Sequence, residues 1–317
     1  MEIISFAVIK LSLISLLGFY LYKKTFINDE VLRFLTFFVV NITVPFLIFS
    51  HLIENSKVVL SHNIWIFIAF SIIVFVTGYL LGLIFSFKRE HKFKSELISS
   101  VSFQNAGYLP MNIAFFIFGP SMREEFFVYI FLYLLGFNIL MWSLGSFLTF
   151  KKSGQKFKSK SIFTPPILST LFALLLIYGD IASFIPEIII TPVKMVGEIS
   201  FVLSMVILGC WLAKAKIRGI SKNLFLLGEV SLIKLVILPL LCLIGLLNFK
   251  IFSLLGVFMI LEAAMPTAVT LPIVADLRAA DSEFVSQGVF LTHIFSVLTI
   301  PVWLGIYLRM SGFSLSL

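Results

Sequence analysis

The sequence predicts an all-α membrane protein, and three observations lead to that class. Of the 317 residues, 60% are hydrophobic and only 13% are charged, whereas soluble proteins contain about 25% charged residues. The apolar residues run in long blocks, and about 20 such residues are needed to span a bilayer as a helix. They do not alternate at every second position, as the strands of a membrane β-barrel do. A soluble enzyme, a disordered chain and a disulfide-rich secreted module are therefore excluded.

Ten apolar segments are long enough to be membrane-spanning helices. Polar or charged residues separate each segment from the next. We expect them at 4–22, 31–53, 62–87, 95–119, 125–150, 162–180, 190–213, 223–247, 252–276 and 284–310. Most of the 24 Lys and Arg residues lie in the connections that follow the odd-numbered segments. Because cytoplasmic loops accumulate Lys and Arg, both termini are expected outside a cell membrane, that is, a plasma or inner membrane.

The most basic connection falls at the middle of the chain, with five segments before it and five after it. We expect a first five-helix repeat over residues 1–150, a cytoplasmic basic loop over 151–161 and a second five-helix repeat over 162–317. Since five is odd, two related halves would have opposite orientations in the membrane. This is the inverted-repeat plan of many secondary transporters.

The fourth segment of each half is interrupted by proline and polar residues. The first interruption covers 104–112 and the second covers 262–272. Proline removes a helix hydrogen bond, glycine leaves helical geometry at low cost, and the freed backbone groups need polar partners or a wet cavity. The alternative is that each proline only kinks a packed helix. Two interruptions at matching positions favour a substrate site near the midplane, with candidate residues Asn105, Gly107, Pro110, Asn112, Glu262, Pro266, Thr267 and Thr270.

Three ionisable residues within the segments are candidates for a coupling ion or a counter-ion. Glu262 could bind a proton or a cation, or it could only pair with Lys234 of the adjoining segment. Lys234 could instead balance an anionic substrate, or pair with Glu229. His293 is either a proton carrier or, as lone histidines more often are, a hydrogen-bonded structural group. We also expect Lys194 to pair with Glu198 four residues on, and Asn138 to make an interhelical hydrogen bond.

Three stretches of the sequence resemble the auxin efflux carrier family, a branch of the bile/arsenite/riboflavin transporter-like superfamily. They are the proline-bearing segment 37–49, the start of the second interruption at 262–266 and the last segment at 290–301. In the first interruption this chain departs from the family pattern, because Pro110 stands where a glycine is usual and Asn112 where a proline is usual.

The resemblance implies ten helices with crossed broken helices 4 and 9. It implies a scaffold domain from helices 1, 2, 6 and 7, a transport domain from helices 3–5 and 8–10, elevator-like movement and a homodimer. It also places Asn41 where the scaffold meets the moving domain.

The function expected from these features is secondary transport of a small organic anion, a carboxylate such as an auxin-like acid or a dicarboxylate. Coupling to a proton or sodium gradient is expected as an option beside uniport. The closest alternative is a cation/proton antiporter of related broken-helix fold. Channel function is a further alternative. A sensor would normally carry a soluble output module, which the sequence lacks. An intramembrane enzyme is not expected, since the sequence offers no reactive cluster. No cofactor, metal or nucleic-acid partner is expected.

Overall fold

A computed structural model describes residues 2–87, 93–150, 163–215 and 220–314. The predicted basic loop 151–161 lies outside the described residues. In the first half the helical elements are α1 (Glu2–Lys23), α2 (Asp29–Phe38), η1 (Val39–Thr43), α3 (Val44–Glu54), α4 (Ser56–Ser61), α5 (Ile64–Ser86), α6 (Lys94–Ser102), α7 (Tyr108–Ile117), α8 (Pro120–Trp142) and α9 (Leu144–Thr149). In the second half they are α10 (Pro165–Tyr178), η4 (Ala182–Phe184), α11 (Glu187–Lys214), α12 (Ile220–Leu232), η5 (Ile233–Ile237), α13 (Leu238–Asn248), α14 (Leu254–Ala263), α15 (Leu271–Leu277) and α16 (Ser282–Ser311).

The described chain is all-helical, and seven of its helices are long and apolar enough to cross a membrane. Three further apolar helices, α7, α10 and α14, are shorter than a full span. Two of these, α7 and α14, belong to the interrupted segments, and the third, α10, is a short helix within the sixth predicted segment. The other seven predicted segments give the seven full-length helices. The ten-helix inverted repeat itself stays a prediction.

Local side chains fix where several helices begin and end. The Asn28 side chain accepts a hydrogen bond from the N–H of Val31 at the start of α2, and Asp281 does the same for Phe284 at the start of α16. Such N-cap bonds satisfy donors that have no partner within the helix. At the end of α16, Gly312 adopts φ 68°, a left-handed conformation that glycine reaches without strain.

Two of the long helices contain a π-helical turn, which is wider than an α-helical turn, and in each of them the turn ends two residues before a proline. The π-helical turn η1 precedes Pro45, and η5 precedes Pro239. Proline has no N–H, so the carbonyl one helical turn earlier loses its usual donor. At η5 that carbonyl belongs to Leu235, and the indole N–H of Trp303 donates to it over 2.7 Å. At η1 the corresponding carbonyl is that of Asn41.

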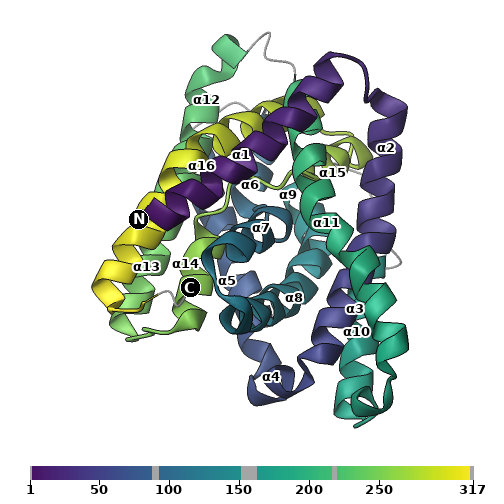
Figure 1. Cartoon of the computed structure of the whole chain (residues 1–317). Coiled ribbons are helices and arrows are strands. Elements are labelled where there is room, and N and C mark those ends of the chain that lie inside the picture. Colours follow the sequence, from purple (N-terminus) through teal and green to yellow (C-terminus); the bar gives the residue numbers. More distant parts are fainter. Residues whose placement is uncertain (1, 88–92, 151–162, 216–219, 315–317) are drawn as a thin grey trace.

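The helices pack in two groups. In the first group, α1 packs against α11, and α3 packs against both α10 and α11, beside which it is seen in Figure 1. In the second group, α5 packs on α6 and α8, α12 and α15 pack on α16, and α14 contacts α8, α13 and α16. The groups meet where α7 and α16 contact α1, where α7 contacts α11, and where α8 contacts α3 and α10.

Helices α1 and α11 approach closely because glycines lie at their contact. A Cβ atom at Gly209 would lie 1.8 Å from the carbonyl oxygen of Ser15, and one at Gly18 would lie 2.1 Å from that of Val206. Small residues allow such backbone approach between membrane helices. The Cys210 thiol donates to the Gly18 carbonyl over 3.3 Å in the same interface.

Candidate functional site

The two predicted interruptions lie against each other. The chain is non-helical between α6 and α7 and again between α14 and α15. Across this crossing the N–H of Asn105 donates to the Pro266 carbonyl over 2.8 Å, and the N–H of Ala268 donates to the Phe103 carbonyl over 3.0 Å. Together with the antiparallel bridge between Gln104 and Thr267, these bonds give the unwound backbone the partners that it lacks within a helix.

A cavity of about 320 Å³ lies beside the crossing. It is lined by η1 and α3, both unwound segments, α7, the second half of α8 and the start of α10. The lining residues are Val40, Asn41, Val44, Gln104, Asn105, Ala106, Gly107, Tyr108, Met111, Leu134, Phe137, Asn138, Met141, Trp142, Thr164, Pro165, Pro166, Ala268, Val269 and Thr270. Among these residues are amide, hydroxyl and aromatic groups, and none is Lys, Arg, Asp or Glu.

Four of the predicted site residues line this cavity, namely Asn41, Asn105, Gly107 and Thr270. The lining set does not include Pro110, Asn112, Pro266, Thr267, Glu262, Lys234 or His293. Asn138, for which the sequence suggested an interhelical hydrogen bond, is part of the cavity wall.

The side chain of Asn105 forms a hydrogen bond with His293. The Nδ1 atom of His293 lies 2.8 Å from the Val289 carbonyl, and its Nε2 atom lies 3.1 Å from the amide nitrogen of Asn105. Only a ring nitrogen that carries a proton can donate to a carbonyl, so the proton is assigned to Nδ1 and Nε2 accepts from Asn105. His293 therefore orients the Asn105 amide, in line with the structural alternative for this histidine.

The side chain of the neighbouring Gln104 is also held by a hydrogen bond to a buried residue. It is 1% exposed, and its side-chain amide donates to the Tyr133 hydroxyl of α8. Two consecutive amides at the crossing are thus positioned by buried partners, and side chains that are supported in this way keep a defined geometry.

Helix α7 begins at the cavity without a side-chain cap. Its N-cap residue is Gly107, so the N–H groups of its first turn have no partner inside the helix. Pro110 lies within the first turn of α7, where a proline is tolerated, and it does not lie in the unwound segment. The N–H groups of Tyr108 and Leu109 remain as donors at the cavity end of the helix.

Glycine was expected at position 107 because it lets the backbone leave helical geometry at low cost, but the backbone conformation there does not need a glycine. Its φ is −118°, a value open to any residue, so the unwound backbone does not require glycine there. A Cβ atom at this position would meet Leu134 at 3.5 Å, an ordinary contact. The missing side chain instead leaves room in the cavity wall.

The other predicted residues of the interruptions hold helices together. Asn112 donates to the Tyr108 carbonyl over 2.7 Å and to the Ser204 hydroxyl of α11 over 3.2 Å. Thr267 is fully buried, and its hydroxyl donates to the Ser100 carbonyl over 2.9 Å. Thr270 precedes α15 as its N-cap residue and lines the cavity.

Glu262 and Lys234 are both fully buried behind the crossing. Lys234 donates to the Val101 carbonyl over 2.9 Å. The Glu262 carboxylate has no hydrogen-bond partner among the described residues, although Lys234 and Gln104 are near enough to act on its charge. A buried carboxylate without hydrogen bonds is costly unless its charge is neutralised.

One expected ion pair has a different partner in the structure. Lys194 pairs with Glu54 of α3 over 2.7 Å, which corrects the expected main partner, Glu198. The helix-face argument failed because α3 and α11 pack side by side and place Glu54 within reach. The described residues contain no group of three or more His, Cys, Asp or Glu side chains that could hold a metal ion.

Sequence reasoning missed the aromatic part of the site and the wide turns. Tyr108, Phe137 and Trp142 line the cavity, but their types do not distinguish them from the many lipid-facing aromatic residues of the chain. The signal for the wide turns was available, because a proline follows each of them. The contact of His51 with Glu124 was also missed, since it joins residues 73 positions apart.

Comparisons of the sequence with known proteins identify its family. The family model described as "Membrane transport protein" matches residues 3–304. An uncharacterized transporter of Methanocaldococcus jannaschii is 24% identical over 300 residues, which cover 91% of this chain and 94% of the relative. An uncharacterized transporter of Methanothermobacter thermautotrophicus is 25% identical over 311 residues, covering 93% of this chain and 96% of the relative. Because the family model spans nearly the whole sequence, this chain belongs to the membrane transport protein family, the auxin-efflux-carrier-like family that its motifs resemble.

Proposed function

We propose that this protein is a secondary transporter that carries a small organic anion, a carboxylate of auxin-like or dicarboxylate type, across a cell membrane. Cargo occupies the 320 Å³ cavity beside the crossing. The single observation that carries this proposal is the meeting of two unwound segments at a cavity that also receives the start of α7.

The chemistry of the cavity supports an anion of mixed character. No lining residue is charged, so the attraction for a carboxylate comes from the free N–H groups and the positive dipole end of α7. The amide of Asn105 adds a directed hydrogen bond. The rings of Tyr108, Phe137 and Trp142 suit an apolar or aromatic body.

The two helix groups support an elevator-type movement. The first group, with α1, α3, α10 and α11, corresponds to the scaffold that the resemblance implies, and the second group to the transport domain. The cavity has walls from both groups, because Asn41 and Pro166 belong to the first and Asn105 and Phe137 to the second. Sliding of the second group along the first would carry the crossing across the membrane.

The cavity reaches the end of α8 and the start of α10, which flank the predicted cytoplasmic loop. With both termini outside, as the basic residues predict, this conformation is the inward-open one. A homodimer through the first group remains part of the proposal by family resemblance.

A cation/proton antiporter is the second candidate, and one observation favours it. Glu262 is fully buried beside the crossing with an unpartnered carboxylate, and intramembrane carboxylates commonly mark proton or ion pathways. In the anion-carrier scheme the same residue couples uptake to a proton or sodium gradient.

Uptake into proteoliposomes tests the proposal. Purified protein is reconstituted and offered radiolabelled indole-3-acetate and succinate, with sodium–proton exchange followed in parallel by a pH-sensitive dye. We expect uptake of an acid by the unmodified protein and its loss in Asn105→Ala, while Asn248→Ala at the exposed end of α13 keeps full activity. Full uptake by Asn105→Ala would exclude the cavity as the binding site, and sodium–proton exchange without acid uptake would favour the antiporter.

A further inference from the structure

A polar cluster joins the two helix groups at the end of the molecule opposite the cavity. Glu124 lies in the second turn of α8, whereas the cavity-lining Trp142 ends that helix. Glu124 lies ten positions before Leu134, the first cavity-lining residue of α8, and eighteen positions before Trp142. At the helical rise of 1.5 Å per residue these separations are about 15 Å and about 27 Å. The cluster therefore lies toward the end of α8 that is farther from the cavity.

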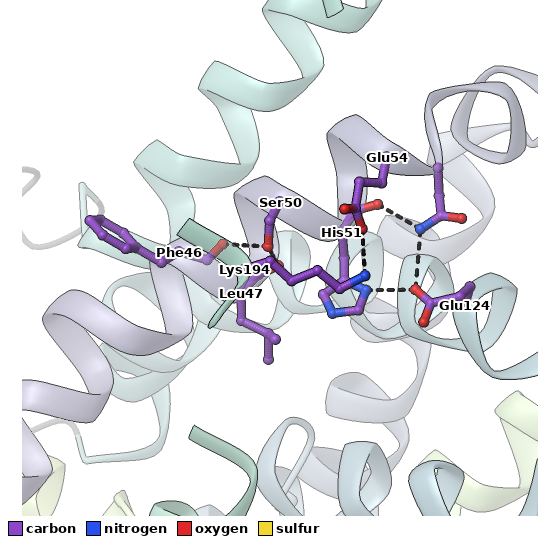
Figure 2. A network of polar contacts seen from close by, with 8 residues as sticks. Phe46, Leu47, Ser50, His51, Glu54, Glu124 and Lys194 are labelled. Carbon is purple, nitrogen blue, oxygen red and sulfur yellow. Dashed lines mark hydrogen bonds and ion pairs between the residues drawn. The ribbon is translucent and has the colours of Figure 1, made fainter. Parts of the chain in front are cut away.

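The centre of this cluster is a contact between His51 of α3 and Glu124 of α8 (Figure 2). The His51 Nδ1 atom lies 2.6 Å from a Glu124 carboxylate oxygen, and the Asn55 amide donates to the same oxygen over 3.3 Å. His51 is only 1% exposed, with its ring edge-on to Phe127. The contact is thus short, shielded from water on the histidine side and made across the boundary between the groups.

Lys194 completes the charge arrangement on the first group. Its ammonium pairs with Glu54 over 2.7 Å and also attracts the Glu124 carboxylate. Figure 2 shows Lys194, Glu54 and His51 gathered beside Glu124. Separation of α8 from α3 would remove the carboxylate from both His51 and Lys194 at once.

The adjacent residue Glu125 makes a similar contact that stays inside the second group. Its carboxylate lies 3.6 Å from the His62 ring and accepts from the Tyr129 hydroxyl. His62 lies between α4 and α5, and its ring packs on Phe67 of α5 and on Tyr129 of α8. Two neighbouring carboxylates therefore have the same chemistry, but only Glu124 bridges the groups.

We propose that the His51–Glu124 contact is a latch that holds the two helix groups together at this end while the cavity is open at the other. The latch must break when the second group slides, so its strength sets the balance between the two open conformations. This inference rests on the alternating access in the proposed function. The Glu124 side chain is 26% exposed, so water can replace histidine on the carboxylate when the latch opens.

Side-specific labelling of one cysteine tests the latch. The background variant carries Cys210→Ala and Cys242→Ala, and Asn138→Cys places a reporter in the cavity wall. A charged, membrane-impermeant maleimide is added to right-side-out or to inverted vesicles. The ratio of the two labelling rates reports the balance between the open conformations.

We expect Glu124→Ala to shift this ratio about tenfold away from the cavity-open side, the factor that corresponds to about 1.4 kcal/mol. His51→Leu should have the same effect. His51→Asn should retain the original ratio, because its amide places an N–H near the position of Nδ1. The matched control Glu125→Ala removes a carboxylate of the same helix turn and should leave the ratio unchanged.

The outcomes separate the latch from the transport scheme. If the reporter reacts from both sides but Glu124→Ala and Glu125→Ala give equal ratios, the latch is overturned and alternating access stands. If the reporter reacts from one side only in every variant, alternating access is contradicted and the latch with it. Elution of each variant as a single peak in size-exclusion chromatography verifies that it is folded.

Discussion

Substitution of Gly209 by alanine should destabilise the protein by separating α1 from α11. The new Cβ atom would lie 1.8 Å from the Ser15 carbonyl oxygen and 2.8 Å from the Phe19 nitrogen. Both are backbone atoms, so no side chain can move aside and the helices must shift. Overpacking costs about 1–3 kcal/mol and occasionally more, while replacing glycine by alanine in a helix gains about 1 kcal/mol.

Because the approach is far inside contact distance, the upper part of that range applies and a net loss of about 2 kcal/mol is expected. For a chain of this size the loss lowers Tm by about 5 °C. Thermal unfolding in detergent, followed by intrinsic tryptophan fluorescence, measures it. Gly228→Ala is the matched control, since nothing lies within 4 Å of its added Cβ, and its Tm should stay equal or rise. A Tm for Gly209→Ala at or above that of the unmodified protein would contradict the close α1–α11 contact.

Three further predictions follow from buried polar groups. Trp303→Phe leaves the Leu235 carbonyl without its donor, so unfolding should cost about 1–3 kcal/mol less and Tm in detergent should fall. Glu262→Gln keeps the shape of the buried side chain but can neither carry a charge nor bind and release a proton, so Tm should hold or rise while proton-driven uptake in proteoliposomes is lost. Proton-coupled uptake by this variant would exclude Glu262 as the coupling residue. Asn105→Asp places a negative charge in the cavity, so acid uptake should drop at least tenfold, and undiminished uptake would argue against an anion at Asn105.

The interrupted segments could be located from sequence because the signal there is local. Proline, glycine and amide residues within otherwise apolar stretches do not sustain a helix in hydrocarbon, and both stretches are indeed non-helical at residues 103–107 and 264–270. Their extent was overestimated, because Pro110 is accommodated inside the first turn of α7. A proline in the first turn has no hydrogen bond to lose.

The partners of individual polar side chains in distant parts of the chain could not be predicted from the sequence. The partner of Lys194 is Glu54, 140 residues away, and nothing in the spacing of either residue indicates that α3 and α11 are neighbours. The same holds for His51 and Glu124, and for His293 and Asn105. Charges within an apolar segment indicate that a partner is needed, but only the packing of the helices decides which residue it is.

The sequence could show where the two π-helical turns lie, but not what type of helix distortion occurs there. Pro45 and Pro239 mark the positions where a helix hydrogen bond is lost, yet the sequence does not say whether the helix kinks, unwinds or widens. At Pro239 the indole of Trp303 supplies the missing donor, which allows the helix to continue. At Pro45 the corresponding residue, Asn41, lines the cavity.

The most direct measurement is a cryo-electron microscopy map of the protein with the acid that it transports. We expect density for the acid in the cavity beside the crossing, with its carboxylate at the N–H groups of Tyr108 and Leu109 and within hydrogen-bond distance of the Asn105 amide. Acid density elsewhere with an empty cavity, or two continuous helices in place of the unwound segments, would contradict transport through this crossing.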